Sequence, residues 1–129
     1  MLWIDHIGYA VEDMTKARRA FQELGYVLDE TVDDPDRQVV ICFGEKDGYR
    51  VELIAPLGPE SPVTQVLGKS GPTPYHICYR TDTFEADLER LQGRRYKLVL
   101  PPQEAIALGG RRVAFLMHLS VGLIELVET

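Results

Sequence analysis

The stretches "DHIGYAV" (residues 5–11) and "YHICYRT" (residues 75–81) decide how this sequence folds. Each contains His-Ile-x-Tyr, and together they hold two of the three histidines in the 129-residue chain. Sliding the chain on itself by 70 residues aligns them and gives six identities between residues 6–28 and 76–98, more than random pairing would give. A repeat of this length indicates one supersecondary unit used twice.

The first half predicts a strand, a helix and three further strands. Residues 2–11 alternate between apolar and polar and are rich in β-branched and aromatic types, which is typical of a strand. Asp13 then precedes apolar residues at helical spacing over 14–24, so we expect it to cap a helix that Gly25 ends. The strands that follow are predicted at residues 26–31, 38–44 and 49–55, with a turn at 46–48 between the last two.

The second half predicts the same order of elements. Asp82 and Glu85 have the spacing of a capping box before a helix over residues 84–92, and strands are predicted at 96–100, 111–118 and 122–128. Between the halves, Ser61 and Pro62 indicate the start of a short helix. The predicted fold class is α+β, a single domain of two βαβββ modules at residues 1–58 and 75–129, joined by a linker at 59–74 whose last part is "GKSGPTP".

The alternation of side chains along a strand predicts where the repeated residues point. The Ile and Tyr of each repeat share one face, which we expect to pack under the helices, whereas His6 and His76 point to the opposite face. Glu52 and Glu125 lie between apolar neighbours in matching strands, so the same parity turns them toward the histidines. The side chains expected in the core are Ile7, Tyr9, Phe21, Leu24, Val51, Leu53, Ile77, Leu88, Leu91, Phe115, Ile124 and Leu126.

These four polar residues indicate a metal site. A single strand histidine usually has a structural role, and a glutamate between apolar residues usually faces solvent. Here His6, His76, Glu52 and Glu125 occur as two symmetric pairs, on matching parity in duplicated strands, and two imidazoles with two carboxylates suit a divalent Zn, Ni, Co, Mn or Fe ion. Without a cation, two carboxylates gathered in one cleft would force one of them to take up a proton.

Charge and composition exclude other classes of protein. The net charge of −6 and the pI of about 5.0 argue against a nucleic-acid-binding protein. No apolar run approaches the length of a membrane span, and the N-terminal residues lack the features of a signal peptide. Cys42 and Cys78 do not form a CxxC pair, and we interpret them as buried thiols of a cytoplasmic protein.

Several longer stretches resemble the vicinal oxygen chelate superfamily, which includes glyoxalase I, methylmalonyl-CoA epimerases, extradiol dioxygenases and bleomycin resistance proteins. "DHIGYAVEDMTKARRAFQELGY" is similar to the family's first βα unit. "YRVELIAPLGPESPV" and "YHICYRTDTFEADLERL" resemble methylmalonyl-CoA epimerases in particular, and "RRVAFL" and "GLIELVE" resemble their last strands. The resemblance covers nearly the whole chain.

The resemblance implies a curled mixed-sheet half-barrel around one metal ion, Co, Ni, Zn or Mn, bound by His6, Glu52, His76 and Glu125. It also implies removal of a proton next to a carbonyl group, with Glu125 as the base. Glu52 and Asp36 are the alternatives for the opposing acid. Two segments depart from the epimerase pattern: residues 36–38 read "DRQ" in place of "EQG", and "MHLSVG" stands in place of an "HPK" segment.

We therefore expect a metal-dependent epimerase or isomerase of a 2-substituted acyl thioester. The main alternative is a glyoxalase I type lyase that acts on a hemithioacetal thiol conjugate. An extradiol dioxygenase would need a further histidine in its pocket, for which His118 is the only candidate, and a non-catalytic drug-binding or resistance module generally lacks the four ligands. The expected partners are a small-molecule substrate and a second copy of the chain in a homodimer, with no nucleic acid or membrane.

Overall fold

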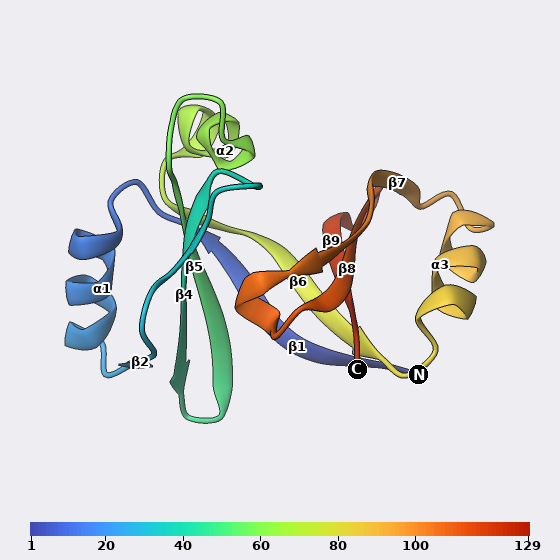
Figure 1. The fold of residues 1–129 in the computed structure, drawn as a ribbon, viewed down its shortest axis with the longest axis horizontal. Coiled ribbons are helices and arrows are strands. Elements are labelled where there is room, and N and C mark those ends of the chain that lie inside the picture. Colours follow the sequence, from blue (N-terminus) through green and yellow to red (C-terminus); the bar gives the residue numbers. More distant parts are fainter. The chain divides into compact units, whose positions relative to one another are not determined.

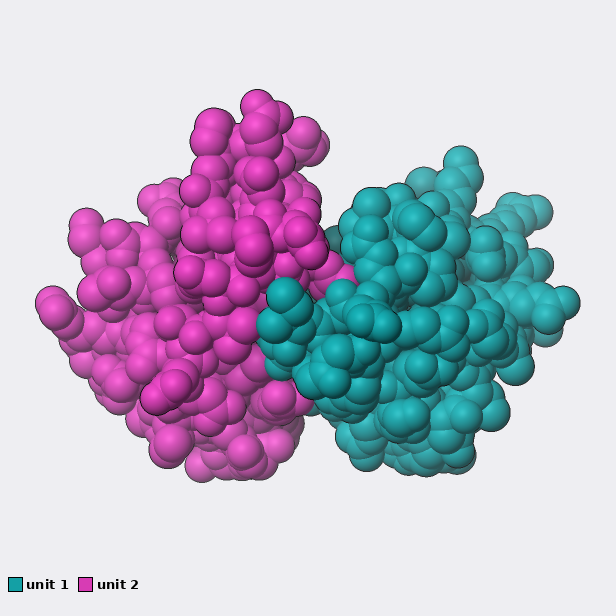
Figure 2. Space-filling model, in the orientation of Figure 1, with its two compact units in different colours: residues 1–5, 76–129 teal, residues 6–75 magenta.

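A computed structural model describes residues 1–129 and contains three α-helices, one short 3-10 helix and nine strands. Contacts between Cα atoms divide the chain into two compact units, coloured separately in Figure 2. The His6 unit comprises His6–Tyr75, and the His76 unit comprises Met1–Asp5 with His76–Thr129. None of the helices is both long and apolar enough to cross a lipid bilayer.

The order of elements confirms the predicted α+β class and the duplicated βαβββ unit (Figure 1). The first module contains β1 (Leu2–Ala10), α1 (Met14–Glu23), β2 (Val27–Leu28), β3 (Val32–Asp34), β4 (Val39–Lys46) and β5 (Tyr49–Pro56). After α2 (Pro62–Ser70), the second module contains β6 (Thr73–Thr81), α3 (Phe84–Gln92), β7 (Lys97–Ala105), the 3-10 helix Ile106–Leu108, β8 (Arg111–His118) and β9 (Gly122–Glu128). The short strands β2 and β3 together replace the single strand expected at residues 26–31.

In the His6 unit the strands are ordered β2-β4-β5-β1, with β3 also paired to β4. β4 and β5 form the long antiparallel hairpin of Figure 1, and β1 runs parallel to β5. Asp47 and Gly48 connect the hairpin with φ values of 54° and 84°. Positive φ at both central residues defines a type I′ turn, which the Asp-Gly pair favours, so the predicted turn is confirmed.

Helix α1 packs on one face of this sheet, as the repeat predicted. Asp13 caps it, because its carboxylate accepts a hydrogen bond from the Lys16 backbone N–H at 2.9 Å. The Phe21 ring lies edge-on to the rings of Tyr9 and Tyr26, with both centroid distances at 5.1 Å. The buried cluster under the helix comprises Val11, Phe21, Cys42, Val51, Leu53 and Ala55.

In the His76 unit the strands are ordered β6-β9-β8-β7, with β6 parallel to β9. The pairing of β7 with β8 has two shifts of register, both between Leu98 and Gln103. In the first module the corresponding segment is divided into the two short strands β2 and β3. Helix α3 packs on one face of this sheet. The buried cluster there comprises Phe84, Leu88, Leu91, Ala114, Leu116, Ile124 and Leu126.

The predicted capping box of α3 is wrong. The N-cap residue is Thr83, whose side chain makes no capping bond, and Asp82 instead lies 3.7 Å from the N-terminal ammonium group. Asp87, in the first turn, accepts hydrogen bonds from the hydroxyls of Thr81 and Thr83 and from Arg90. A buried carboxylate inside the helix therefore anchors α3 to the end of β6.

Other local expectations were corrected by tertiary structure. Ser61 occupies the N-cap of α2, but its buried hydroxyl has no hydrogen-bond partner. The linker predicted at residues 59–74 contains the short helix expected there, α2, which runs past Gly68 to Ser70, and residues 73–74 already belong to β6. Leu24 is 63% exposed because it is the C-cap of α1 and lies past the part of the helix that packs on the sheet. Ile77 is 36% exposed, and nothing in the structure explains why.

Candidate functional site

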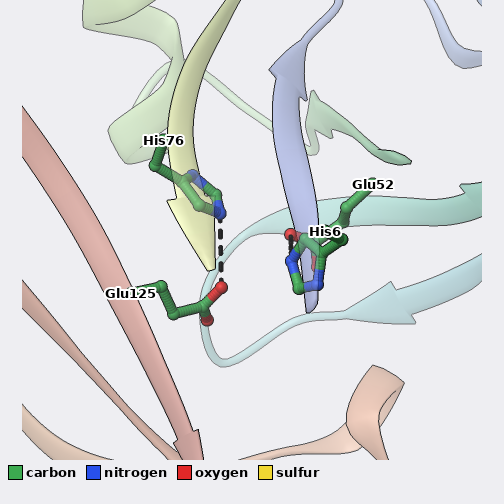
Figure 3. A group of neighbouring side chains, drawn as sticks. All are labelled: His6, Glu52, His76 and Glu125. Carbon is green, nitrogen blue, oxygen red and sulfur yellow. Dashed lines mark hydrogen bonds and ion pairs between the residues drawn. The ribbon is translucent and has the colours of Figure 1, made fainter. Parts of the chain in front are cut away.

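The first predicted pair lies on the face of the His6 unit sheet that is opposite α1. Parallel pairing of β1 with β5 places Gly8 beside Glu52, and Nε2 of His6 lies 3.1 Å from Oε1 of Glu52 (Figure 3). His6 is 1% exposed and Glu52 is 4% exposed. The alternation of β5, whose Val51 and Leu53 pack under α1, therefore turns Glu52 toward His6 as predicted.

The second predicted pair is built in the same way in the His76 unit. β6 runs parallel to β9 with Cys78 beside Glu125, and Nε2 of His76 lies 3.2 Å from Oε1 of Glu125 (Figure 3). His76 is 4% exposed and Glu125 is 2% exposed. The structure thus brings together each predicted histidine with its predicted glutamate, in the same register in both modules.

Each pair also has an aromatic neighbour that the sequence analysis did not assign to the site. Phe43 lies across from Glu52 in the β4–β5 register, and its ring stands edge-on to His6 at 5.2 Å. Phe115 lies across from Glu125 in the β8–β9 register, and its ring stands edge-on to His76 at 5.3 Å. The repeat of Phe one residue after a small buried residue, in "ICF" and "VAF", is the sequence signal that could have found them.

Phe115 was expected in the core under α3, and this expectation is wrong. Its neighbours Ala114 and Leu116 belong to that core, so alternation places Phe115 on the other face, where it is half-buried beside His76. We call this face the ligand face of each sheet. It carries His6, Phe43 and Glu52 in one unit, and His76, Phe115 and Glu125 in the other.

The donor atoms in each pair suit a divalent ion. Imidazole nitrogen and carboxylate oxygen both bind zinc-like ions at about 2.0–2.2 Å, so two such ligands of one ion lie about 3–3.5 Å apart, depending on the coordination angle. The observed separations of 3.1 Å and 3.2 Å match this arrangement. Burial of both carboxylates is costly without a compensating positive charge, which a divalent cation bound there would supply.

Asp36, the other predicted catalytic residue, lies elsewhere in the His6 unit. It is exposed, in the turn between β3 and β4. The turn leads into Val39, the first residue of β4, which pairs with Pro56 of β5. Pro56 is four residues, or about 13 Å, along β5 from Glu52, so the turn that holds Asp36 joins the sheet far from Glu52. The buried carboxylate of this turn is Asp34, which accepts a hydrogen bond from the Arg37 backbone N–H at 3.2 Å.

His118 does not lie on the ligand face. It packs against Tyr96 with a centroid distance of 4.4 Å, and its Nδ1 accepts a hydrogen bond from the Ser120 backbone N–H. Tyr96 packs against the core under α3, so His118 is on the helix side of β8. The additional pocket histidine that the dioxygenase interpretation needs is therefore not provided by this residue.

Comparison with known proteins gives one consistent family. The model of the Glyoxalase/Bleomycin resistance protein/Dioxygenase superfamily matches residues 5–115. Mitochondrial methylmalonyl-CoA epimerase of Mus musculus is 30% identical over 129 residues, covering 97% of this chain and 72% of the mouse protein. Ethylmalonyl-CoA/methylmalonyl-CoA epimerase of Cereibacter sphaeroides is 29% identical over 115 residues, covering 88% of this chain and 86% of that protein.

A solved structure supports the same assignment. Methylmalonyl-CoA epimerase from Mycobacterium tuberculosis superposes with a TM-score of 0.84 and 28% sequence identity, over 97% of this chain and 86% of that one. This match confirms the glyoxalase-like fold. The chain belongs to the glyoxalase/bleomycin resistance protein/dioxygenase superfamily, the vicinal oxygen chelate proteins.

Proposed function

We propose that this protein is a divalent-metal-dependent epimerase or isomerase of a 2-substituted acyl thioester of the methylmalonyl-CoA type. The observation that carries the proposal is the buried His–Glu pair that occurs in the same register in both modules. The relatives named methylmalonyl-CoA epimerase, at 28–30% identity, support the choice of reaction and substrate.

One pair offers two donors, fewer than the three or four protein ligands of typical zinc sites. We therefore propose that His6, Glu52, His76 and Glu125 together hold one ion, Co, Ni, Zn or Mn. A divalent cation held by these residues would supply positive charge next to the substrate carbonyl, which favours loss of the neighbouring proton.

Glu125 is the proposed base. Its carboxylate takes the proton from C2 of the substrate, the electrons of that C–H bond form the C1–C2 double bond, and the carbonyl π electrons move to the oxygen. A second acid then returns a proton to C2 from the other face, which inverts the configuration. No oxidant or further reactant is needed, because the same atoms and electrons are present before and after.

Glu52 is the better candidate for this second acid. It is buried, pairs with His6 and matches Glu125 in the duplicated register, whereas Asp36 lies in an exposed turn. The glyoxalase I alternative has no named relative among the comparisons above to favour it. The homodimer and the cytoplasmic location stay predictions.

Two measurements on the purified protein test the proposal. Metal analysis should find about one divalent ion per chain, as in other mononuclear sites. Metal-loaded protein in D2O should then exchange the C2 proton of methylmalonyl-CoA, with the methylglyoxal hemithioacetal as the comparison substrate. Exchange only in the hemithioacetal would favour the lyase, and a fully metallated protein that exchanges neither would contradict enolate chemistry and favour a dioxygenase or a non-catalytic binding module.

A further inference from the structure

The two ligand faces differ in charge at the cross-strand positions next to their Phe–Glu pairs. In the His6 unit, next to the pair of Phe43 and Glu52, the β4–β5 register pairs Glu45 with Arg50. In the His76 unit, next to Phe115 and Glu125, the β8–β9 register pairs Met117 with Leu123. The His–Glu pairs are duplicated, but a charged pair at these two cross-strand positions is found in one module alone.

Arg50 is close to the proposed metal ligands of its own unit. Ile7 of β1 and Val51 of β5 are neighbours in the parallel register. The residues directly before them, His6 and Arg50, are therefore also neighbours on the two strands. Arg50 therefore lies on the strand next to His6, about 4.8 Å away at the backbone, and shares the ligand face with Glu52, two residues on. Leu123 has the same relation to His76 in the other unit.

The side chain of Arg50 is held in place by an aromatic ring. Its guanidinium carbon lies 4.1 Å from the centroid of Phe43, whose ring in turn stands 5.2 Å from that of His6. Stacking on an aromatic face restricts a guanidinium to one plane, and the N–H groups that bind a carboxylate in a bidentate manner lie in that plane. Phe43 thus links the arginine directly to the proposed metal ligand.

Arg50 and Phe43 also line an open cavity of about 320 Å³ in the His6 unit. The cavity extends over the end of the β4–β5 hairpin and is also lined by Asp29, Glu45 and Asp47. These acids weaken the attraction of the cavity as a whole for anions, and Lys46, the other cation of the lining, forms an ion pair with Asp47 at 3.6 Å. A specific anion contact near the proposed metal ligands therefore depends on the guanidinium beside Phe43. Glu45, which faces Arg50 across the strands, competes with an incoming carboxylate.

We propose that Arg50 binds a carboxylate of the substrate and so selects acyl thioesters that carry one next to the reacting carbon. This inference rests on the proposed epimerase function and assigns a specificity-determining residue to it. An arginine bound to a carboxylate through two charge-assisted hydrogen bonds discriminates against an analogue that lacks the carboxylate. In the other module, Leu123 has no such group.

The test compares the binding of methylmalonyl-CoA and propionyl-CoA, which differ only by the carboxylate at C2. Isothermal titration of metal-loaded wild type should show tighter binding of methylmalonyl-CoA. Arg50→Gln should lose roughly 10- to 100-fold in affinity for methylmalonyl-CoA, the usual worth of hydrogen bonds to a charged group, with affinity for propionyl-CoA little changed. Arg50→Lys should lose less, and Glu45→Gln should increase the preference.

Arg19→Gln, an exposed change on α1, is the matched control and should keep the wild-type preference. Thermal unfolding and metal content show whether Arg50→Gln has kept its fold and its ion. If it has not, Arg50→Lys is compared with wild type in its place. If Arg50→Gln keeps the full preference for methylmalonyl-CoA while wild type exchanges its C2 proton, the inference is wrong and the epimerase function stands. If wild type binds the two thioesters equally and exchanges neither, both fail.

Discussion

The two modules share a triad of His, Phe and Glu but differ on both faces of their sheets. On the ligand face, the module of the His6 unit has a charged pair beside its triad, and the module of the His76 unit has an apolar pair. On the helix face, Val11 and Ala17 of the first module stand where the second has Thr81 and the buried Asp87. Duplication has kept the residues for the proposed chemistry, whereas the charge beside the triad and the core packing have diverged.

The largest expected effect tests whether the two glutamates are equivalent. Glu125→Gln keeps an oxygen donor but removes the basic carboxylate, so C2 proton exchange should fall by about 10²–10⁴, the usual worth of a positioned general base. Glu52→Gln should slow inversion of configuration more than it slows exchange. Both rates can be measured with methylmalonyl-CoA in D2O.

Asp36→Asn is the control for the second acid and should change inversion little. If instead Glu125→Gln exchanges as fast as wild type and Glu52→Gln is inactive, the base belongs to the other module. Loss of inversion in Asp36→Asn alone would assign the second acid to the exposed turn.

The second prediction tests whether both histidines hold the ion. His76→Ala and His6→Ala should each lose most of the bound metal, because each change removes one of the two nitrogen donors of the proposed four-ligand site. Metal content after dialysis, measured by mass spectrometry, is the readout. His118→Ala removes the third histidine, which packs on Tyr96, and should keep the metal. Unchanged metal in both ligand variants would show that the site is assigned wrongly.

The third prediction concerns the helix faces. Phe21→Ala should cost about 3–5 kcal/mol of unfolding free energy, because it empties a ring site packed against Tyr9 and Tyr26. Leu91 is the matching residue of the second module, and Leu91→Ala should lower the free energy of unfolding by about 2–5 kcal/mol. Leu24→Ala, an exposed change on α1, should stay within about 0.5 kcal/mol. Urea unfolding measures all three, and a loss below about 1 kcal/mol for Phe21→Ala would mean that α1 packs through another face.

The smallest expected effect concerns Asp87. Burial raises the pKa of its carboxyl, but hydrogen bonds from Thr81, Arg90 and Thr83 outweigh burial and hold the pKa below its ordinary value. A lowered pKa in the folded state stabilises the protein above the unfolded pKa of about 3.9, and this contribution is lost as the pH falls through the folded pKa.

Asp87→Asn should therefore destabilise the protein by about 1.5–3 kcal/mol at pH 7, the usual contribution of hydrogen bonds to a charged group. The difference from wild type should shrink as the pH is lowered below about 4. Urea unfolding at both pH values measures this. Glu89→Gln, an exposed change on the same helix, is the control. An equal loss at both pH values would show that the charge of Asp87 has no part in the network.

Local patterns in the sequence determined much of the fold and the candidate site. The repeat of His-Ile-x-Tyr predicted the duplicated module, and Asp13 and the Asp47–Gly48 turn were placed correctly because a cap and a tight turn depend on a few adjacent residues. Strand alternation predicted that the histidines and the glutamates share one face of each sheet, since a period of two fixes the face of every side chain. The strand register then placed each histidine beside the glutamate of its own module.

Tertiary structure decided what depends on pairing between distant strands and on packing between layers. Phe43 and Phe115 reach the histidines because of the hairpin register, and Arg50 lies beside His6 because of the parallel register of β1 with β5. A charged residue such as Asp87 in a helix usually faces solvent, but here it is buried and accepts hydrogen bonds from the hydroxyls of Thr81 and Thr83. Sequence periodicity gives the face on which a side chain lies, and only the pairing of strands gives its neighbour across that face.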